Sequence, residues 1–142
     1  MDEIWTAIIE KLRADELLSR LVGQRIWYGL PRSEVTLFPA VRLVVIGDVP
    51  NTTVPGDYEV RLQVDVTAES ASAGWPVVRG IESVLRHPTR ENREPMETET
   101  HWVRGALPRT TVAVASSREN PRGGGGLVQL STDWTLKITR KD

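Results

Sequence analysis

Two long segments of the chain place an apolar residue at nearly every second position, and this alternation limits the folds open to it. One segment covers residues 58–68 and the other covers residues 128–139. Successive side chains of a β-strand point to opposite faces, so each segment predicts a strand with one apolar and one polar face. Residues 47–56 are too few for a crossover helix, so we expect 58–68 to pair antiparallel with a strand at residues 40–46.

Apolar residues at three- and four-residue intervals predict helices elsewhere in the chain. The first begins near Asp2, and the second is a short helix with Asp15 as its N-cap and Gly23 as its C-terminal stop. The third helix has Pro76 in its first turn and stops around His87-Pro88. Further strands are expected at residues 25–28, 102–106 and 110–115. We therefore predict an α+β fold, a mostly antiparallel β-sheet with N-terminal helices and one central helix packed on one face.

The chain is expected to form a single domain, because 142 residues with 39% apolar side chains suffice for one core. Polar, charged or glycine-rich stretches separate the predicted elements. We expect three of them to be flexible loops: residues 50–56, 89–100 and 116–126. No apolar run approaches the roughly 20 residues of a membrane helix, so we expect no membrane partner.

The residue types that carry most enzyme chemistry are scarce in this chain. It has no cysteine, which excludes disulfides, thiolate metal sites and cysteine nucleophiles, and its two histidines lack partners at metal-ligand spacing. The four glycines at residues 123–126 lead into a strand, whereas a phosphate-binding loop leads into a helix. We therefore predict that the chain is not an enzyme and has no catalytic, metal or cofactor site.

The polar faces of the two long strands carry the main candidates for a subunit interface. We expect the following residues to lie near one another: Arg61, Gln63, Asp65, Gln129, Ser131 and Asp133. Such a face suits subunit packing, and a solvated sheet face explains it equally well. Among the tryptophans, Trp27 and Trp102 are candidate exposed anchors, whereas the others fit the core: Trp5, Trp75 and Trp134.

Charge is unevenly distributed along the chain, although the net charge is only −1. Residues 1–101 carry 11 basic and 16 acidic side chains, whereas residues 102–142 carry 7 basic and 3 acidic ones. This dipolar distribution could orient identical subunits head to tail, and unevenly solvated charge is the other interpretation.

Several short motifs follow one another in a characteristic order. Gly23-Gln24-Arg25-Ile26-Trp27 precedes a proline-rich turn, Phe38-Pro39-Ala40-Val41 opens a strand, and Gln63-Val64-Asp65-Val66 precedes a helix start made of small residues. In this order they resemble the tail terminator, or tail completion, proteins of long-tailed bacteriophages. The resemblance covers residues 1–86 and, more loosely, the final strand. It implies a structural virion protein without enzymatic activity.

The resemblance further implies a hexameric ring that caps the growing tail tube and joins the tail to the head. The implied partners are copies of the chain itself, the tail tube protein and a head-completion or connector protein. Genome DNA would pass through the ring without sequence-specific contact. The implied location is the tail or neck of the virion, after assembly in the cytoplasm of the bacterial host.

The loops at residues 50–56 and 116–126 are expected to become ordered when the chain contacts the tail tube or a neighbouring subunit. Their candidate contact residues are Asn51, Thr52, Thr53, Arg118 and Arg122. Two alternative functions stay open. One is a head-completion ring subunit in the neck of the same virion. The other is a small α+β ligand-binding domain that holds an anion with Arg42, Arg61 or Arg104.

Overall fold

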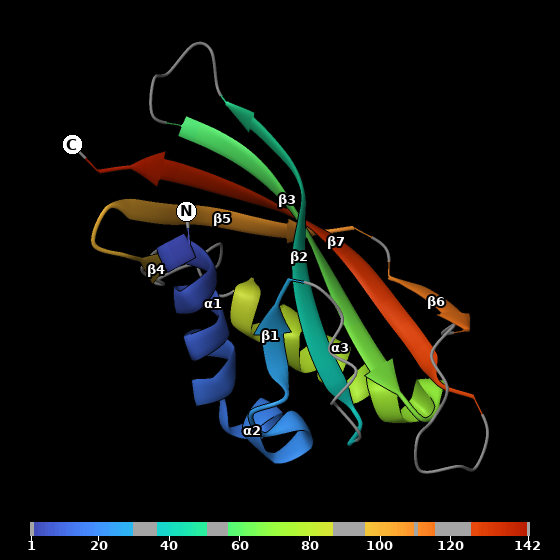
Figure 1. Cartoon of the computed structure of the whole chain (residues 1–142). Helices are drawn as coiled ribbons and strands as arrows, with labels where there is room; N and C mark the ends of the chain where they lie inside the picture. Colours follow the sequence, from blue (N-terminus) through green and yellow to red (C-terminus); the bar gives the residue numbers. More distant parts are fainter. Residues whose placement is uncertain are drawn as a thin grey trace.

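A computed structural model of the chain shows a seven-stranded sheet packed against helices (Figure 1). The structure describes residues 2–29, 37–50, 57–86, 96–109, 111–115 and 126–141. The helices are α1 (Asp2–Ala14), α2 (Glu16–Val22) and α3 (Ala71–Leu85). The strands are β1 (Ile26–Tyr28), β2 (Ala40–Pro50), β3 (Asp57–Ala68), β4 (Met96–Glu97), β5 (His101–Pro108), β6 (Val112–Ala115) and β7 (Val128–Arg140). The predicted α+β class is confirmed.

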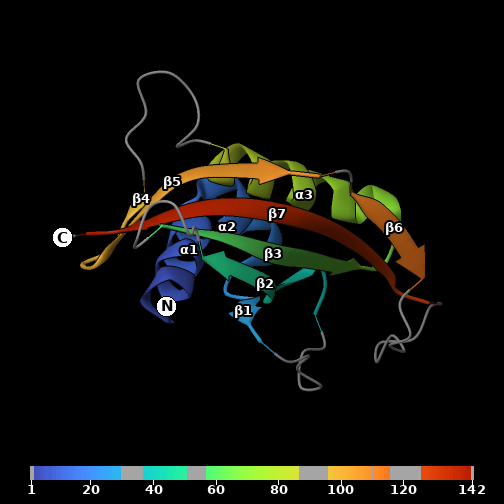
Figure 2. The ribbon, with the colours of Figure 1, turned by 90° about the horizontal axis from the view of Figure 1, so that it is seen from above.

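The two alternating segments form the centre of the sheet as neighbouring strands. The strand order is β1-β2-β3-β7-β5-β4, with β6 paired to β7 beyond the end of β5. All pairs are antiparallel except β1 with β2. Figure 2 shows that β3 and β7 curve strongly along their length. The mostly antiparallel sheet that the alternation predicts is therefore confirmed.

One face of β3 and β7 forms the core with the helices. In the antiparallel register Leu62 lies opposite Trp134 and Val66 lies opposite Leu130, so apolar side chains from both strands share this face. Helix α3 packs on these two strands, and α1 packs near β1. The side chains that fill the core include Ile4, Ile8, Leu12, Leu18, Leu43, Leu62, Ile81, Leu130, Trp134 and Leu136.

The helix ends follow local capping chemistry. Asp15 accepts a hydrogen bond from the Leu18 backbone N–H at 3.1 Å, and Gly23 ends α2 with φ 55°, so both predicted ends are confirmed. Helix α3 begins earlier than predicted, because the Ser70 hydroxyl accepts from the Ala73 N–H and starts the helix at Ala71. Pro76 consequently lies inside the helix rather than in its first turn.

Two further predictions are corrected by the structure. The charged segment 89–100, expected to be a loop, contains β4, which pairs with Val103 and Trp102 of β5. Trp27, expected to be an exposed anchor, is buried with 8% of its surface exposed. Its register partner is Arg42, so the two side chains share the face of the sheet opposite the core.

Candidate functional site

The six polar residues predicted to lie near one another do so on the outer face of β3 and β7. The register places Gln63 opposite Asp133 and Asp65 opposite Ser131, and Gln129 follows on the same face. The Gln129 side-chain amide donates to the Ser131 hydroxyl at 3.0 Å. The alternation that made one face apolar has therefore gathered the polar side chains on the other.

Asp65 is the centre of this outer face. Its carboxylate accepts hydrogen bonds from the Arg42 guanidinium at 2.8 Å, the Gln63 amide at 2.8 Å and the Ser131 hydroxyl at 2.7 Å. The residue is only 2% exposed, although it lies on the face that the sequence predicts to be polar. Its three partners come from β2, β3 and β7, so one buried carboxylate ties three strands together.

A second ion pair on the same face is more accessible. Arg61 donates to Asp133 at 3.1 Å, and these side chains are 41% and 35% exposed. An exposed pair of this kind adds little to folding stability, because water solvates both charges and salt screens them. The charged groups of Arg61 and Asp133 are therefore accessible to another molecule, whereas the Asp65 carboxylate is buried and bonded to side chains of its own chain.

The residues proposed for anion binding do not form a pocket where the structure describes them. The Arg42 guanidinium is occupied by Asp65 and by the Gly29 carbonyl at 3.3 Å. The space between α3 and the sheet, lined in part by Val78 and Trp134, has a volume of about 10 Å³ and holds at most one water. The side chain of Arg104 lies outside the described residues, and so do the loop candidates Asn51, Thr52, Thr53, Arg118 and Arg122.

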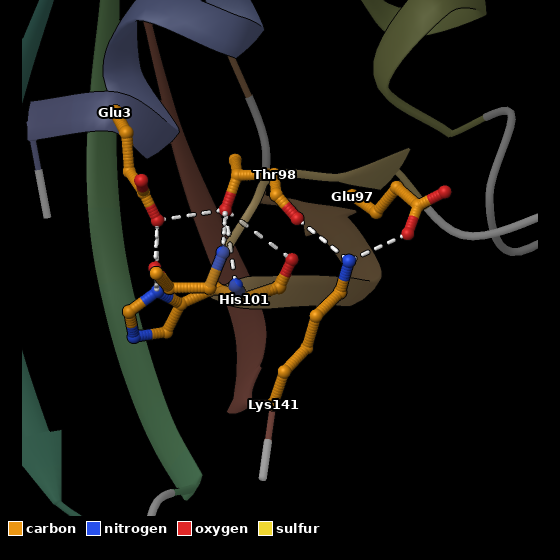
Figure 3. Close-up of polar contacts among 6 residues, drawn as sticks. Glu3, Glu97, Thr98, His101 and Lys141 are labelled. Atoms are coloured by element: carbon orange, nitrogen blue, oxygen red, sulfur yellow. Dashed lines mark hydrogen bonds and ion pairs between the residues drawn. The ribbon is translucent and has the colours of Figure 1, made fainter.

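The structure also gathers polar groups that the sequence does not connect. Glu3 at the start of α1 accepts hydrogen bonds from the hydroxyls of Thr98 (2.8 Å) and Thr100, and it contacts His101 Nδ1 at 3.2 Å (Figure 3). These bonds hold the pKa of Glu3 at about 2, below its usual 4.5, with the Thr100 hydroxyl as the largest cause. The cluster fixes the start of α1 to the turn between β4 and β5.

Lys141 extends this cluster at the end of β7. Its ammonium donates to Glu97 at 2.6 Å and to the Thr98 carbonyl at 2.7 Å (Figure 3), and it lies 4.4 Å from the centre of the Trp102 ring. The residue that follows β7 therefore contacts β4 and the turn after it at one end of the sheet. Within the residues that the structure describes, no group of three metal-ligating side chains is present.

Comparison with known proteins identifies the family of the chain. Residues 6–116 match the family described as tail completion protein gp17. The chain belongs to this family. The resemblance noted in the sequence is therefore confirmed, and this tail completion family member is a structural component of a phage-type virion.

A solved structure shows the same fold as this tail completion family member. A chain in the virion of a native gene transfer agent particle matches with a TM-score of 0.72 and 13% sequence identity. The alignment covers 97% of the chain and 96% of the chain in that particle. No curated protein sequence matches significantly. Among the described residues, no helix is long and apolar enough to cross a membrane.

Proposed function

We propose that the chain is a ring subunit of the tail terminator type, which caps the tail tube and forms the surface that joins tail to head. The observation that carries this proposal is the family match over residues 6–116, which covers most of the fold. The similar chain in a gene transfer agent virion supports it, because its fold agrees over nearly the whole length of both chains.

The partners follow from this role. They are other copies of the chain, in a hexamer, together with the tail tube protein and a head-completion or connector protein. Genome DNA passes through the ring without sequence-specific contact, and assembly takes place in the cytoplasm of the bacterial host. The outer-face residues that keep exposed charge, Arg61 and Asp133, contact a neighbouring subunit, and the loops around Thr52 and Arg118 contact the tail tube or the head connector.

Native mass spectrometry over a concentration series tests the ring. We expect a hexamer. A monomer at every concentration would limit the ring to assembly on a tail tube, which the capping assay then decides. Arg61→Glu should weaken the oligomer, because it places a carboxylate beside Asp133 on the outer face. Arg79→Glu is the matched control, since Arg79 is exposed on α3 and lies away from that face.

A capping assay distinguishes a tail terminator, which binds the end of the tail tube, from a head-completion protein, which binds the head connector. Purified chain is added to polymerising tail tube protein, and tube lengths are measured by electron microscopy. A terminator shortens the tubes and decorates one end. Binding to purified head connectors without any effect on tube length would instead favour the head-completion role.

A further inference from the structure

Strand β6 presents an apolar edge that the described part of the chain leaves uncovered. Val112, Ala113, Val114 and Ala115 are all exposed, and Val112 and Val114 keep 55% and 47% of their surface. Among the described residues β6 pairs only with β7. Val112 lies opposite Ser131 and Val114 lies opposite Gln129, so both valines are continuous with the polar outer face.

An uncharged, exposed edge strand is unusual in a soluble protein, because it offers unpaired backbone groups and apolar side chains together. Edge strands are ordinarily blocked by charge, and β1 at the opposite edge of the sheet shows such a block. The Arg13 guanidinium donates to the Ile26 carbonyl at 2.6 Å, and the Ile26 N–H donates to the Gln24 carbonyl at 2.8 Å. The two edges of this sheet therefore differ, one closed and one open.

A groove runs beside the closed edge, between α1 and β1. Its volume is about 280 Å³, enough for two valine side chains. Ile9 and Tyr28 contribute apolar side chains to a lining that is otherwise largely polar, and Thr6 and Glu10 contribute groups that can accept hydrogen bonds. The groove thus offers two apolar side chains, Ile9 and Tyr28, for contact with valines, and acceptors for free backbone N–H groups.

We propose that β6 of one copy packs into the α1–β1 groove of the next copy. This inference rests on the proposed ring and names the surfaces that build it. A ring needs two unlike surfaces on each subunit, and β6 and the groove are unlike surfaces at opposite edges of one sheet. Exposed Arg109 lies close before β6, and exposed Glu10 lines the groove beside Arg13. The Arg13 guanidinium already donates to the Gln24 and Ile26 carbonyls, so the charge pairing that we propose is between Arg109 and Glu10.

Cysteine cross-linking tests the contact directly, because the natural chain has no cysteine. The variant with Val114→Cys and Thr6→Cys should form a covalent ladder under oxidation, up to the number of subunits in the ring. The variant with Val114→Cys and Ser19→Cys is the matched control, since Ser19 is exposed on α2 outside the groove. Disulfide dimers of Val114→Cys alone would overturn the proposal, because they require two β6 strands to face each other.

A charge exchange provides the second test. Arg109→Glu should weaken self-association roughly tenfold, and adding Glu10→Arg should restore it to within about threefold of the natural protein. Loss without restoration would overturn the pairing of these two surfaces. Hydrogen exchange on the unmodified protein gives an independent readout, since the amides of residues 112–115 should become protected when the oligomer forms.

The outcomes separate this inference from the proposed function. If the natural protein forms a hexamer but the Val114→Cys and Thr6→Cys variant gives no ladder, the ring stands and the contact is wrong. If the natural protein stays monomeric at every concentration and also fails to decorate tail tubes, the ring itself is refuted and the contact falls with it. Circular dichroism melting of each variant shows whether the fold is intact.

Discussion

Removing the buried carboxylate of Asp65 should destabilise the chain more than removing any other described acid on the outer face. In Asp65→Ala the Arg42 guanidinium, the Gln63 amide and the Ser131 hydroxyl lose a shared acceptor. Breaking a buried ion pair by deleting one partner costs about 3–5 kcal/mol. The Arg42 side chain keeps 22% exposure, so water solvates it in part, and we expect the low end of that range, about 3 kcal/mol.

Urea denaturation, at a protein concentration where the chain is monomeric, measures this loss of unfolding free energy. In a thermal melt the same loss should lower Tm by roughly 10 °C for a chain of this size. Asp133→Ala is the matched control. Its carboxylate is 35% exposed and pairs with Arg61, so its removal should cost at most about 1 kcal/mol. Equal losses in the two variants would refute the reasoning. Replacing the whole pair, with Asp65→Leu and Arg42→Met, should recover most of the stability, because no unpaired charge remains.

Three further tests concern the stability of the fold at acid pH, the contact of α3 with α2, and the end of α2. The pKa of Glu3 is lowered to about 2, so its stabilising bonds are intact above pH 4.5 and are lost as the pH falls toward 2. In Glu3→Gln the free energy of unfolding, measured by denaturant titration, should fall less steeply between pH 4.5 and pH 2. An unchanged pH dependence would show that the Glu3 carboxylate does not stabilise the fold. Gly80→Ala places a Cβ 2.8 Å from Leu18 Cδ2 and should cost about 1–3 kcal/mol in thermal melts, whereas Gly126→Ala, with open space around it, should not. Gly23→Ala, at φ 55°, should cost about 2 kcal/mol, and an unchanged Tm would show that the backbone relaxes there.

Much of the fold can be predicted from the sequence because its strongest signals are periodic. The alternation in residues 58–68 and 128–139 predicts two amphipathic strands, and the structure makes them adjacent. Asp15 and Gly23 mark their helix ends through local hydrogen bonding and backbone geometry, which need no distant partner. The start of α3 is harder to predict, because the sequence offers two signals for it. Pro76 is typical of a first turn and Ser70 is typical of an N-cap, and in the structure Ser70 caps the helix.

The contacts of the outer face are only partly predictable. The six polar residues are found together because strand register alone places them. The pairing of Arg42 with Asp65 is harder to foresee, because a shift between Val45 and Gly47 breaks simple counting along β2 and β3. The Glu3 cluster joins residues about a hundred positions apart, and no local pattern marks such a contact.

The closed edge at β1 also governs what happens when copies of the chain are crowded. Fibres grow when each added strand exposes a fresh row of N–H and C=O groups to the next one. At Ile26 those groups already bond to Arg13 and Gln24, so a strand of the next copy cannot pair with β1 at this residue. Fibre growth by strand addition is therefore opposed at Ile26. Ordered assembly is left to side-chain recognition, which can reject a wrongly oriented neighbour.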